Sequence, residues 1–301
     1  FIASRGLFKV NSSTGKPVTV VNTRAQLGQH IRAWKQAGET VGFVPTMGAL
    51  HGGHLSLVEK AREKASRTVA SIFVNPAQFA PGEDFETYPR DSDIDIAKLE
   101  SVGCDLVYLP SVEEMYPEGN TTNVRVEDMS DLLDGVYRPH FFYGVTTVVA
   151  RLFLHVQPDV AVFGEKDYQQ LQIIRRMVRD LGFPIEIVGG ETTRDADGLA
   201  QSSRNLYLKP EERVAAGALQ GALHRASVRL AIGVTPSVAL DEARALVTAA
   251  GFRQLDYVSL VDPATLLDLP NTPLTPGTIA RLLGAAWIGK TRLIDNISAT
   301  R

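Results

Sequence analysis

The sequence predicts an α/β protein in which a parallel β-sheet covered by helices is followed by a smaller α+β domain. Between residues 18 and 188, short β-branched runs alternate with helical patterns, an order typical of parallel strands under helices on both faces. After Gly189 and Gly190 this alternation gives way to helices rich in alanine and leucine, then to closing strands. With 301 residues, 44% hydrophobic and 22% charged, the chain has the composition of a globular protein with a large core.

The elements are expected in the following order. Strands are predicted at residues 18–21, 41–44, 69–74, 105–109, 160–163 and 185–188, and helices at 23–36, 55–65, from Asp91 or Ser92 onward, at 146–156, and after Gly164. Beyond a boundary near residue 190, helices are expected at 210–230 and 236–250 and strands at 256–261, 278–290 and 291–296. These patterns predict a first domain over 18–190 and a C-terminal lid domain over 191–301. Residues 1–17 read as a leader or expression remnant and are left out of the fold prediction.

Composition limits the partners. A net charge of −3 provides no overall electrostatic attraction to nucleic acid. The single cysteine, Cys104, excludes an internal disulfide and fits a reducing compartment, so the cytoplasm is the expected location. No apolar run approaches the roughly 18 residues of a membrane span. Composition therefore gives no sign of a nucleic-acid or membrane partner, although a local basic groove remains compatible with it.

One stretch, residues 45–54, carries the strongest functional signal. It joins the strand at 41–44 to the helix at 55–65 through a glycine-bearing turn that includes Gly48. The first amides of a helix are unpaired and its dipole favours an anion, so this turn predicts a phosphate site that His51 and His54 can both reach. Two other interpretations are a plain turn with surface histidines and a metal pair. Zinc usually takes three or four ligands, and no nearby cysteine or third histidine completes such a set.

The decapeptide Pro45-Thr46-Met47-Gly48-Ala49-Leu50-His51-Gly52-Gly53-His54 resembles the PTMGALHxGH motif of the pantothenate synthetases, members of the HxGH nucleotidylyltransferase superfamily. Four further segments follow in the family's order and resemble NPxQF (residues 75–79), RPxHFxGV (138–145), GxKDxQQ (164–170) and DGLAxSSRN (197–205). The third departs from the pattern: Phe141 stands where the family has histidine, and His140 lies one position early. No role is assigned to His140.

The resemblance implies a Rossmann-like fold of the HxGH type and a homodimer. It also implies ATP-dependent condensation of (R)-pantoate with β-alanine. Pantoate carboxylate would attack the α-phosphate of ATP, with Mg²⁺ accompanying the nucleotide, to give a pantoyl adenylate and pyrophosphate. The amine of β-alanine would then displace AMP and form pantothenate.

Residue roles follow from the same resemblance. His51, His54 and Lys166 would be catalytic, and residues 197–205 would cover the phosphates as a lid. Asp95 is a weak candidate for contact with Mg²⁺, because a carboxylate in a first helical turn more often complements the helix dipole. The full ATP set is Met47, Gly48, His51, His54, Gly164, Lys166, Asp167, Thr193, Ser202, Ser203 and Arg204, and the pantoate/β-alanine set is Pro45, Thr46, Met47, Asn75, Gln78 and Gln170.

Several alternatives remain at this stage. Another HxGH nucleotidylyltransferase, acting on phosphopantetheine or a pyridine mononucleotide, would need a second phosphate site, whereas Gln78 and Gln170 suit a small hydroxy acid. A nucleotide-binding module without catalysis would bind ATP and release no pyrophosphate. A luciferase-like enzyme that adenylates another acid is compatible with the motif spacing. A tRNA-charging enzyme is disfavoured by the short second domain and the lack of a basic appendage.

Overall fold

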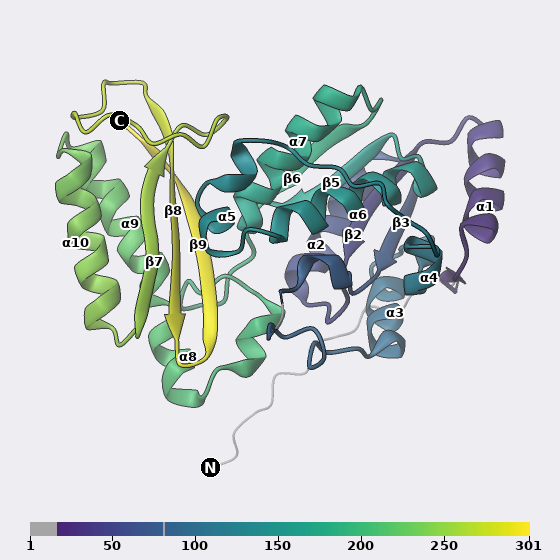
Figure 1. The fold of residues 1–301 in the computed structure, drawn as a ribbon, viewed down its shortest axis with the longest axis horizontal. Coiled ribbons are helices and arrows are strands. Elements are labelled where there is room, and N and C mark those ends of the chain that lie inside the picture. The colour runs from purple at the N-terminus through teal and green to yellow at the C-terminus, as the bar shows by residue number, and fades with distance from the viewer. Residues whose placement is uncertain (1–16, 81) are drawn as a thin grey trace, which may run out of the picture.

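The computed structural model describes residues 17–80 and 82–301, which form two β-sheets lying side by side (Figure 1). The larger sheet has six parallel strands and the smaller has three antiparallel ones. The predicted fold class is confirmed. The segment predicted as a leader lies outside the described residues, apart from Pro17.

The larger sheet and its helices occupy the chain up to residue 190. Their elements are β1 (Thr19–Val21), α1 (Arg24–Gln36), β2 (Val41–Thr46), α2 (Gly52–Lys64), β3 (Arg67–Ile72), α3 (Ser92–Ser101), β4 (Leu106–Tyr108), α6 (Phe141–Val156), β5 (Val160–Gly164), α7 (Tyr168–Leu181) and β6 (Glu186–Gly190), with short turns of helix at α4 (Val112–Met115) and α5 (Asp134–Tyr137). The strands lie in the order β1-β4-β3-β2-β5-β6.

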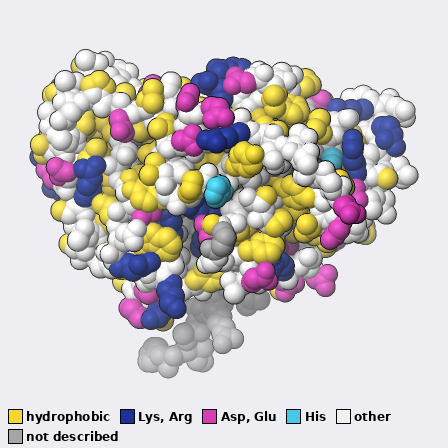
Figure 2. Space-filling view, viewed as in Figure 1, with side chains coloured by type: hydrophobic (Ala, Val, Ile, Leu, Met, Phe, Trp, Pro, Cys, Tyr) yellow, Lys and Arg dark blue, Asp and Glu magenta, His cyan; other side chains and the backbone are white. Residues whose placement is uncertain are grey.

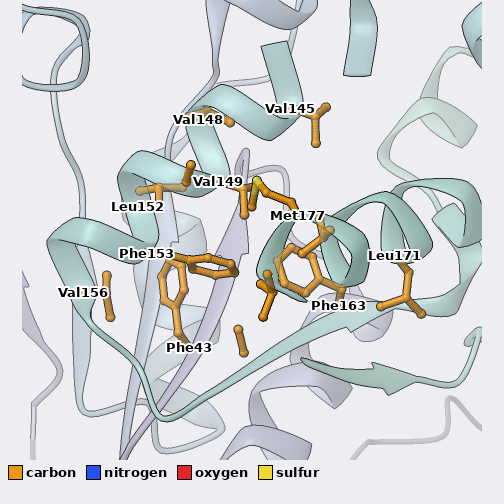
Figure 3. Packing of buried hydrophobic residues seen from close by; sticks show 14 of the residues in the cluster. Phe43, Val145, Val148, Val149, Leu152, Phe153, Val156, Phe163, Leu171 and Met177 are labelled. Carbon is orange, nitrogen blue, oxygen red and sulfur yellow. The ribbon is translucent and has the colours of Figure 1, made fainter. Parts of the chain in front are cut away.

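Helices cover both faces of this sheet, because successive side chains of each strand point to opposite sides. On one face Phe43 packs with helices α1, α6 and α7, its ring 6.4 Å from that of Phe153 (Figure 3). On the other, Val44 packs with helices α2 and α3.

The smaller sheet, in the order β7-β8-β9, packs one face against two helices, with a core that includes Leu223, Leu230 and Leu282. The expectation of one helix over 210–230 is wrong, because the helix is interrupted at Gly217, between α8 and α9. A Cβ there would lie 3.1 Å from the carbonyl oxygen of Asp197, so the break fits closely against the predicted lid. The elements are α8 (Pro210–Ala216), α9 (Ala218–Ala231), α10 (Pro236–Ala249), β7 (Gln254–Val261), β8 (Ile279–Ile288) and β9 (Thr291–Thr300).

Helix α6 begins at Phe141, five residues before the expected start at residue 146. Its first turn lies against the 3₁₀ helix η1 (Pro76–Gln78), so closely that a Cβ on Gly144 would come within 2.3 Å of the Ala77 carbonyl oxygen. Only glycine allows this contact, which no local pattern of apolar residues reveals.

The strand order places a crevice beside β2. Strands β2, β3 and β4 progress in one direction across the sheet, whereas β5 lies on the other side of β2. The ladder between β2 and β5 runs from Gly42–Val160 to Phe43–Ala161, while the ladder between β2 and β3 continues to Thr46–Ile72. Since β2 and β5 part toward their carboxyl ends, they open the kind of switch point at which parallel sheets bind ligands.

Within the described residues, no helix combines the length and apolar character needed to span a membrane. On the face shown in Figure 2, basic and acidic side chains are interspersed among apolar ones. This distribution fits the small net charge of the whole chain.

Candidate active site

A cavity occupies the crevice and extends under the lid segment, which we define as residues 193–205. It brings together nearly all of the predicted site residues from separate stretches of chain. Gly48 and Asp95 are not in its lining. The predicted residues that line it are Pro45, Thr46, Met47, His51, His54, Asn75, Gln78, Gly164, Lys166, Asp167, Gln170, Thr193, Ser202, Ser203 and Arg204.

The two histidines form the N-terminal cap of α2. His51 precedes the helix, and its Nδ1 accepts from the Gly53 amide at 3.2 Å, while Nδ1 of His54 accepts from the His51 amide at 3.3 Å. This reciprocal arrangement is a capping box built from imidazoles. Because both Nδ1 atoms are acceptors, each neutral ring carries its proton on Nε2, which remains available as a donor.

The surroundings keep both rings neutral. Burial is the main cause that lowers the pKa of His51 to about 4, and Lys166 lowers it further. Burial, followed by the neighbouring His51 and Lys166, lowers the pKa of His54 to about 3. A neutral imidazole can still donate a hydrogen bond from Nε2–H to a phosphate oxygen. Next to the two neutral imidazoles, positive charge is supplied by Lys166 and by the α2 dipole.

Asp95 supports the turn that precedes α2. It is 2% exposed, and its two oxygens accept from the Ala49 amide at 2.7 Å and the Leu50 amide at 2.8 Å. Lys98, one helical turn on, donates to the Leu50 carbonyl at 2.6 Å. Ala49 has a φ of +51°, a conformation that L-residues rarely adopt, so these bonds hold a strained turn in place.

The magnesium role of Asp95 stays a prediction, and the geometry favours a positioning role instead. The carboxylate is not part of the cavity lining, and each of its oxygens accepts from a backbone amide. Within residues 17–80 and 82–301, no group of three or more His, Cys, Asp or Glu side chains could hold a metal ion. We therefore infer that Asp95 positions the turn.

Replacing Asp95 by alanine should therefore lower stability and activity together. Two buried amides would lose their acceptor, at a cost of about 1–3 kcal/mol each. We expect a lower unfolding temperature and a lower kcat/KM, with no change in the Mg²⁺ concentration that gives half-maximal activity. A normal unfolding temperature combined with a raised Mg²⁺ requirement would instead support the metal-binding role.

Gln78 is oriented by a chain of buried hydrogen bonds. The Tyr116 hydroxyl donates to Oδ1 of Asn75 at 2.7 Å, and Nδ2 of Asn75 donates to Oε1 of Gln78 at 3.1 Å. With its oxygen engaged, Gln78 presents Nε2 near Sδ of Met47, at 2.8 Å, on the cavity wall. Asn75, which is 1% exposed, therefore acts by orienting Gln78. Tyr116 was not predicted, because it lies outside every motif.

Lys166 sits on a turn fastened by the smaller sheet. Nδ2 of Asn296, in β9, donates to the Glu165 carbonyl at 2.9 Å and to the Lys166 carbonyl at 2.8 Å. Arg281, in β8, reaches Glu165 at 3.3 Å. The lysine side chain lines the cavity, with Nζ 3.9 Å from an oxygen of Asp167. Sequence patterns give no sign of Asn296, which reaches Lys166 across 130 residues of chain.

The lid segment is also held by β9. Arg194 forms a bidentate pair with Asp295, at 2.7 and 2.8 Å, next to an antiparallel bridge between Arg194 and Ala200. Farther along, Arg204 pairs with Asp84 at 3.1 Å, and the Ser203 hydroxyl lies 3.2 Å from that of Tyr88. Asp84 and Tyr88 were also missed, because they meet the lid through tertiary contact alone.

The altered motif places an aromatic ring in the wall. Phe141 lines the cavity, whereas His140 is exposed and its side chain makes no capping bond to α6. The guanidinium of Arg138 lies 3.8 Å from the centre of the Phe141 ring and is paired with Glu83 at 2.7 and 2.8 Å. Phe141 is thus stacked under a neutralised arginine at the position where the motif has histidine.

Comparison with known proteins gives one consistent result. A family model described as pantoate–β-alanine ligase matches residues 19–298. Pantothenate synthetase from Hyphomonas neptunium is 74% identical over 97% of this chain and 100% of its own length, and that from Caulobacter vibrioides is 53% identical over 93% and 98%.

Solved structures agree. Pantothenate synthetase from Thermus thermophilus has a TM-score of 0.86 with 51% identity, covering 93% of this chain and 99% of its own. Pantoate–β-alanine ligase from Francisella tularensis, complexed with β-γ ATP and β-alanine, has a TM-score of 0.78 with 33% identity over 93% and 97%. Fold, motifs and relatives together show that the chain belongs to the pantoate–β-alanine ligase family, as an enzyme that joins pantoate to β-alanine to give pantothenate.

Proposed function

We propose that this enzyme uses ATP to form a pantoyl adenylate in the cavity and that β-alanine then displaces AMP. The observation that carries the proposal is the meeting of three groups around one space: the imidazole-capped N-terminus of α2, Lys166, and the lid residues Ser202 to Arg204. Each can donate to or neutralise phosphate oxygens. Together they suit an α-phosphate that gains charge under carboxylate attack while pyrophosphate leaves.

The proposed roles follow the geometry. His51 and His54 would donate Nε2–H bonds to the α-phosphate, and Lys166 would neutralise the phosphate chain. Mg²⁺ would enter as the counter-ion of ATP. It would lower the charge of the leaving pyrophosphate, and no step is assigned to a protein-held metal. Because no covalent enzyme intermediate is needed, the buried Cys104 takes no part.

Other residues of the cavity lining suit pantoate. They include apolar side chains, Phe73, Val145 and Leu152, and the amides of Gln78 and Gln170. Pantoate carries two methyl groups and two hydroxyls, which match an apolar wall and a pair of amides. Gln78 would donate through Nε2, since Asn75 holds its oxygen.

Exchange of labelled pyrophosphate into ATP tests the proposal directly. We expect exchange when pantoate is present and β-alanine is absent, because a shielded pantoyl adenylate can be attacked by pyrophosphate to regenerate ATP. Omitting pantoate should abolish exchange. Exchange that requires β-alanine would rule out a separate adenylate step and indicate a concerted reaction.

Gln78→Ala should raise the KM for pantoate while leaving the affinity for ATP nearly unchanged. Loss of one hydrogen bond to a substrate hydroxyl or carboxylate costs on the order of 1–3 kcal/mol, which corresponds to a roughly five- to 150-fold increase. Asn75→Ala should shift pantoate KM in the same direction by releasing the Gln78 amide. A change confined to ATP would place Gln78 in the wrong subsite.

The remaining proposals rest mainly on the family resemblance. We infer a homodimer and a cytoplasmic location. The presence of a single cysteine, which leaves no internal disulfide, supports the latter. We also infer a division into domains over 18–190 and 191–301, supported by a second hydrophobic core whose buried residues all lie between Leu199 and Ala299.

A further inference from the structure

The lid contains a side chain, Gln201, whose position in the DGLAxSSRN motif is the unspecified one. Gln201 lies in the cavity lining and reaches across to α2, where its Oε1 accepts from the Gly53 amide at 3.1 Å. Its Nε2 donates to Asp195 at 3.1 Å. The other oxygen of Asp195 accepts from Arg213, in α8, at 2.8 Å. This series fixes the glutamine amide with its oxygen toward the helix.

The Gly53 amide belongs to the first turn of α2, where unpaired amides and the helix dipole favour an anion. It already donates to Nδ1 of His51, and the Gln201 oxygen is a second acceptor on the same hydrogen. An uncharged carbonyl oxygen therefore lies where a phosphate oxygen would meet the helix end.

The other polar groups of the lid are engaged in a similar way. The Arg204 guanidinium binds both oxygens of Asp84, at 3.1 and 3.2 Å, in the fork geometry that also suits phosphate. Ser203 lies 3.2 Å from the Tyr88 hydroxyl. The lid therefore contacts the rest of the chain through oxygen atoms, such as those of Asp84, that occupy positions a phosphate could take.

We propose that Gln201 is a latch that stands in for a nucleotide phosphate: it holds the lid on α2 in the absence of ATP and must leave the helix end when ATP binds. This rests on the proposed function, which brings ATP phosphates to that helix end. A phosphate oxygen is charged and forms stronger hydrogen bonds than an amide oxygen, so replacement of the Gln201 oxygen by a phosphate oxygen is favourable. The latch nonetheless competes with ATP and lowers its affinity.

Gln201→Leu tests the latch, since leucine has a similar size and cannot accept the Gly53 bond. A hydrogen bond of ordinary net strength corresponds to about a fivefold change, so ATP should bind to the variant about five times more tightly by calorimetry. Without ATP, amide hydrogen exchange over residues 193–205 should become faster. Asp195→Ala should shift both in the same direction, because it frees the Gln201 amide to rotate. Leu206→Ala is the matched control, as this neighbouring side chain is 76% exposed.

The outcomes are distinct. Unchanged ATP affinity in a folded Gln201→Leu protein would overturn the latch, and weaker affinity would show instead that Gln201 helps to bind the nucleotide. If the unaltered enzyme shows no pantoate-dependent pyrophosphate exchange, the proposed function fails. If exchange is normal and Gln201→Leu has no effect on affinity, only the latch fails.

Discussion

His54→Ala is expected to lower turnover by a factor on the order of 10²–10³, with much less effect on ATP binding. That factor is typical for removal of one donor aimed at developing charge, equivalent to about 2.7–4 kcal/mol. The neutral Nε2–H of His54 contributes most when the α-phosphate becomes pentavalent, so the loss should appear in kcat rather than KM. Steady-state kinetics with ATP varied at saturating pantoate and β-alanine measures it.

His54 also accepts the His51 amide, so stability must be separated from catalysis. His54→Gln provides this control, because glutamine at the third helical position can reach back to the same amide. We expect His54→Gln to keep most of the unfolding temperature lost in His54→Ala while remaining slow. His140→Ala, at an exposed histidine, should be fully active. Near-normal turnover in both His54 variants would make the histidine purely structural.

Lys166→Ala is expected to suppress pantoate-dependent pyrophosphate exchange by a factor on the order of 10³, since it removes the cation that we propose faces the phosphates. Supplied with pre-formed pantoyl adenylate, the same variant should lose roughly tenfold or less of its amide-forming rate. This difference is expected because the proposed role of the lysine is in the phosphoryl step and not in the attack by the amine.

A charge-matched control is available on α2. Lys64→Met removes the same charge from the far end of the helix, about 18 Å from its N-terminus at about 1.5 Å per residue, and should leave exchange unchanged. An equal loss in both half-reactions of Lys166→Ala would contradict the assignment and point to a general collapse of the site. The unfolding temperature of the variant distinguishes that case.

The sequence predicted the elements and motifs that depend on local patterns. The six strands and the helix after the HxGH turn follow from periodicity, and the turn itself from its glycines and histidines. Apart from Thr193, every candidate that lines the cavity comes from a contiguous motif. The family resemblance also chose between two adjacent glutamines, which periodicity does not do. Gln169 is buried and accepts from the Asp134 amide, whereas Gln170, the one predicted for the site, lines the cavity.

What could not be predicted depends on contacts between distant parts of the chain. Asp95 was a plausible metal ligand by position, and only the folded turn shows its oxygens occupied by the Ala49 and Leu50 amides. The early start of α6 depends on Gly144 meeting Ala77, and the partners of Lys166 and Arg204 come from remote loops and strands. Such pairings leave no periodic signal.

The attachment of the Lys166 turn to β9 has a consequence for inhibition. Asn296 holds that turn, and its neighbour Asp295 holds the lid through Arg194, so two adjacent residues of one strand secure two parts of the proposed phosphate site. A compound that wedges between β9 and this turn would displace the lysine and loosen the lid without touching any substrate. Inhibition of that kind would be noncompetitive toward ATP, pantoate and β-alanine, and a rising concentration of any of these metabolites would not relieve it.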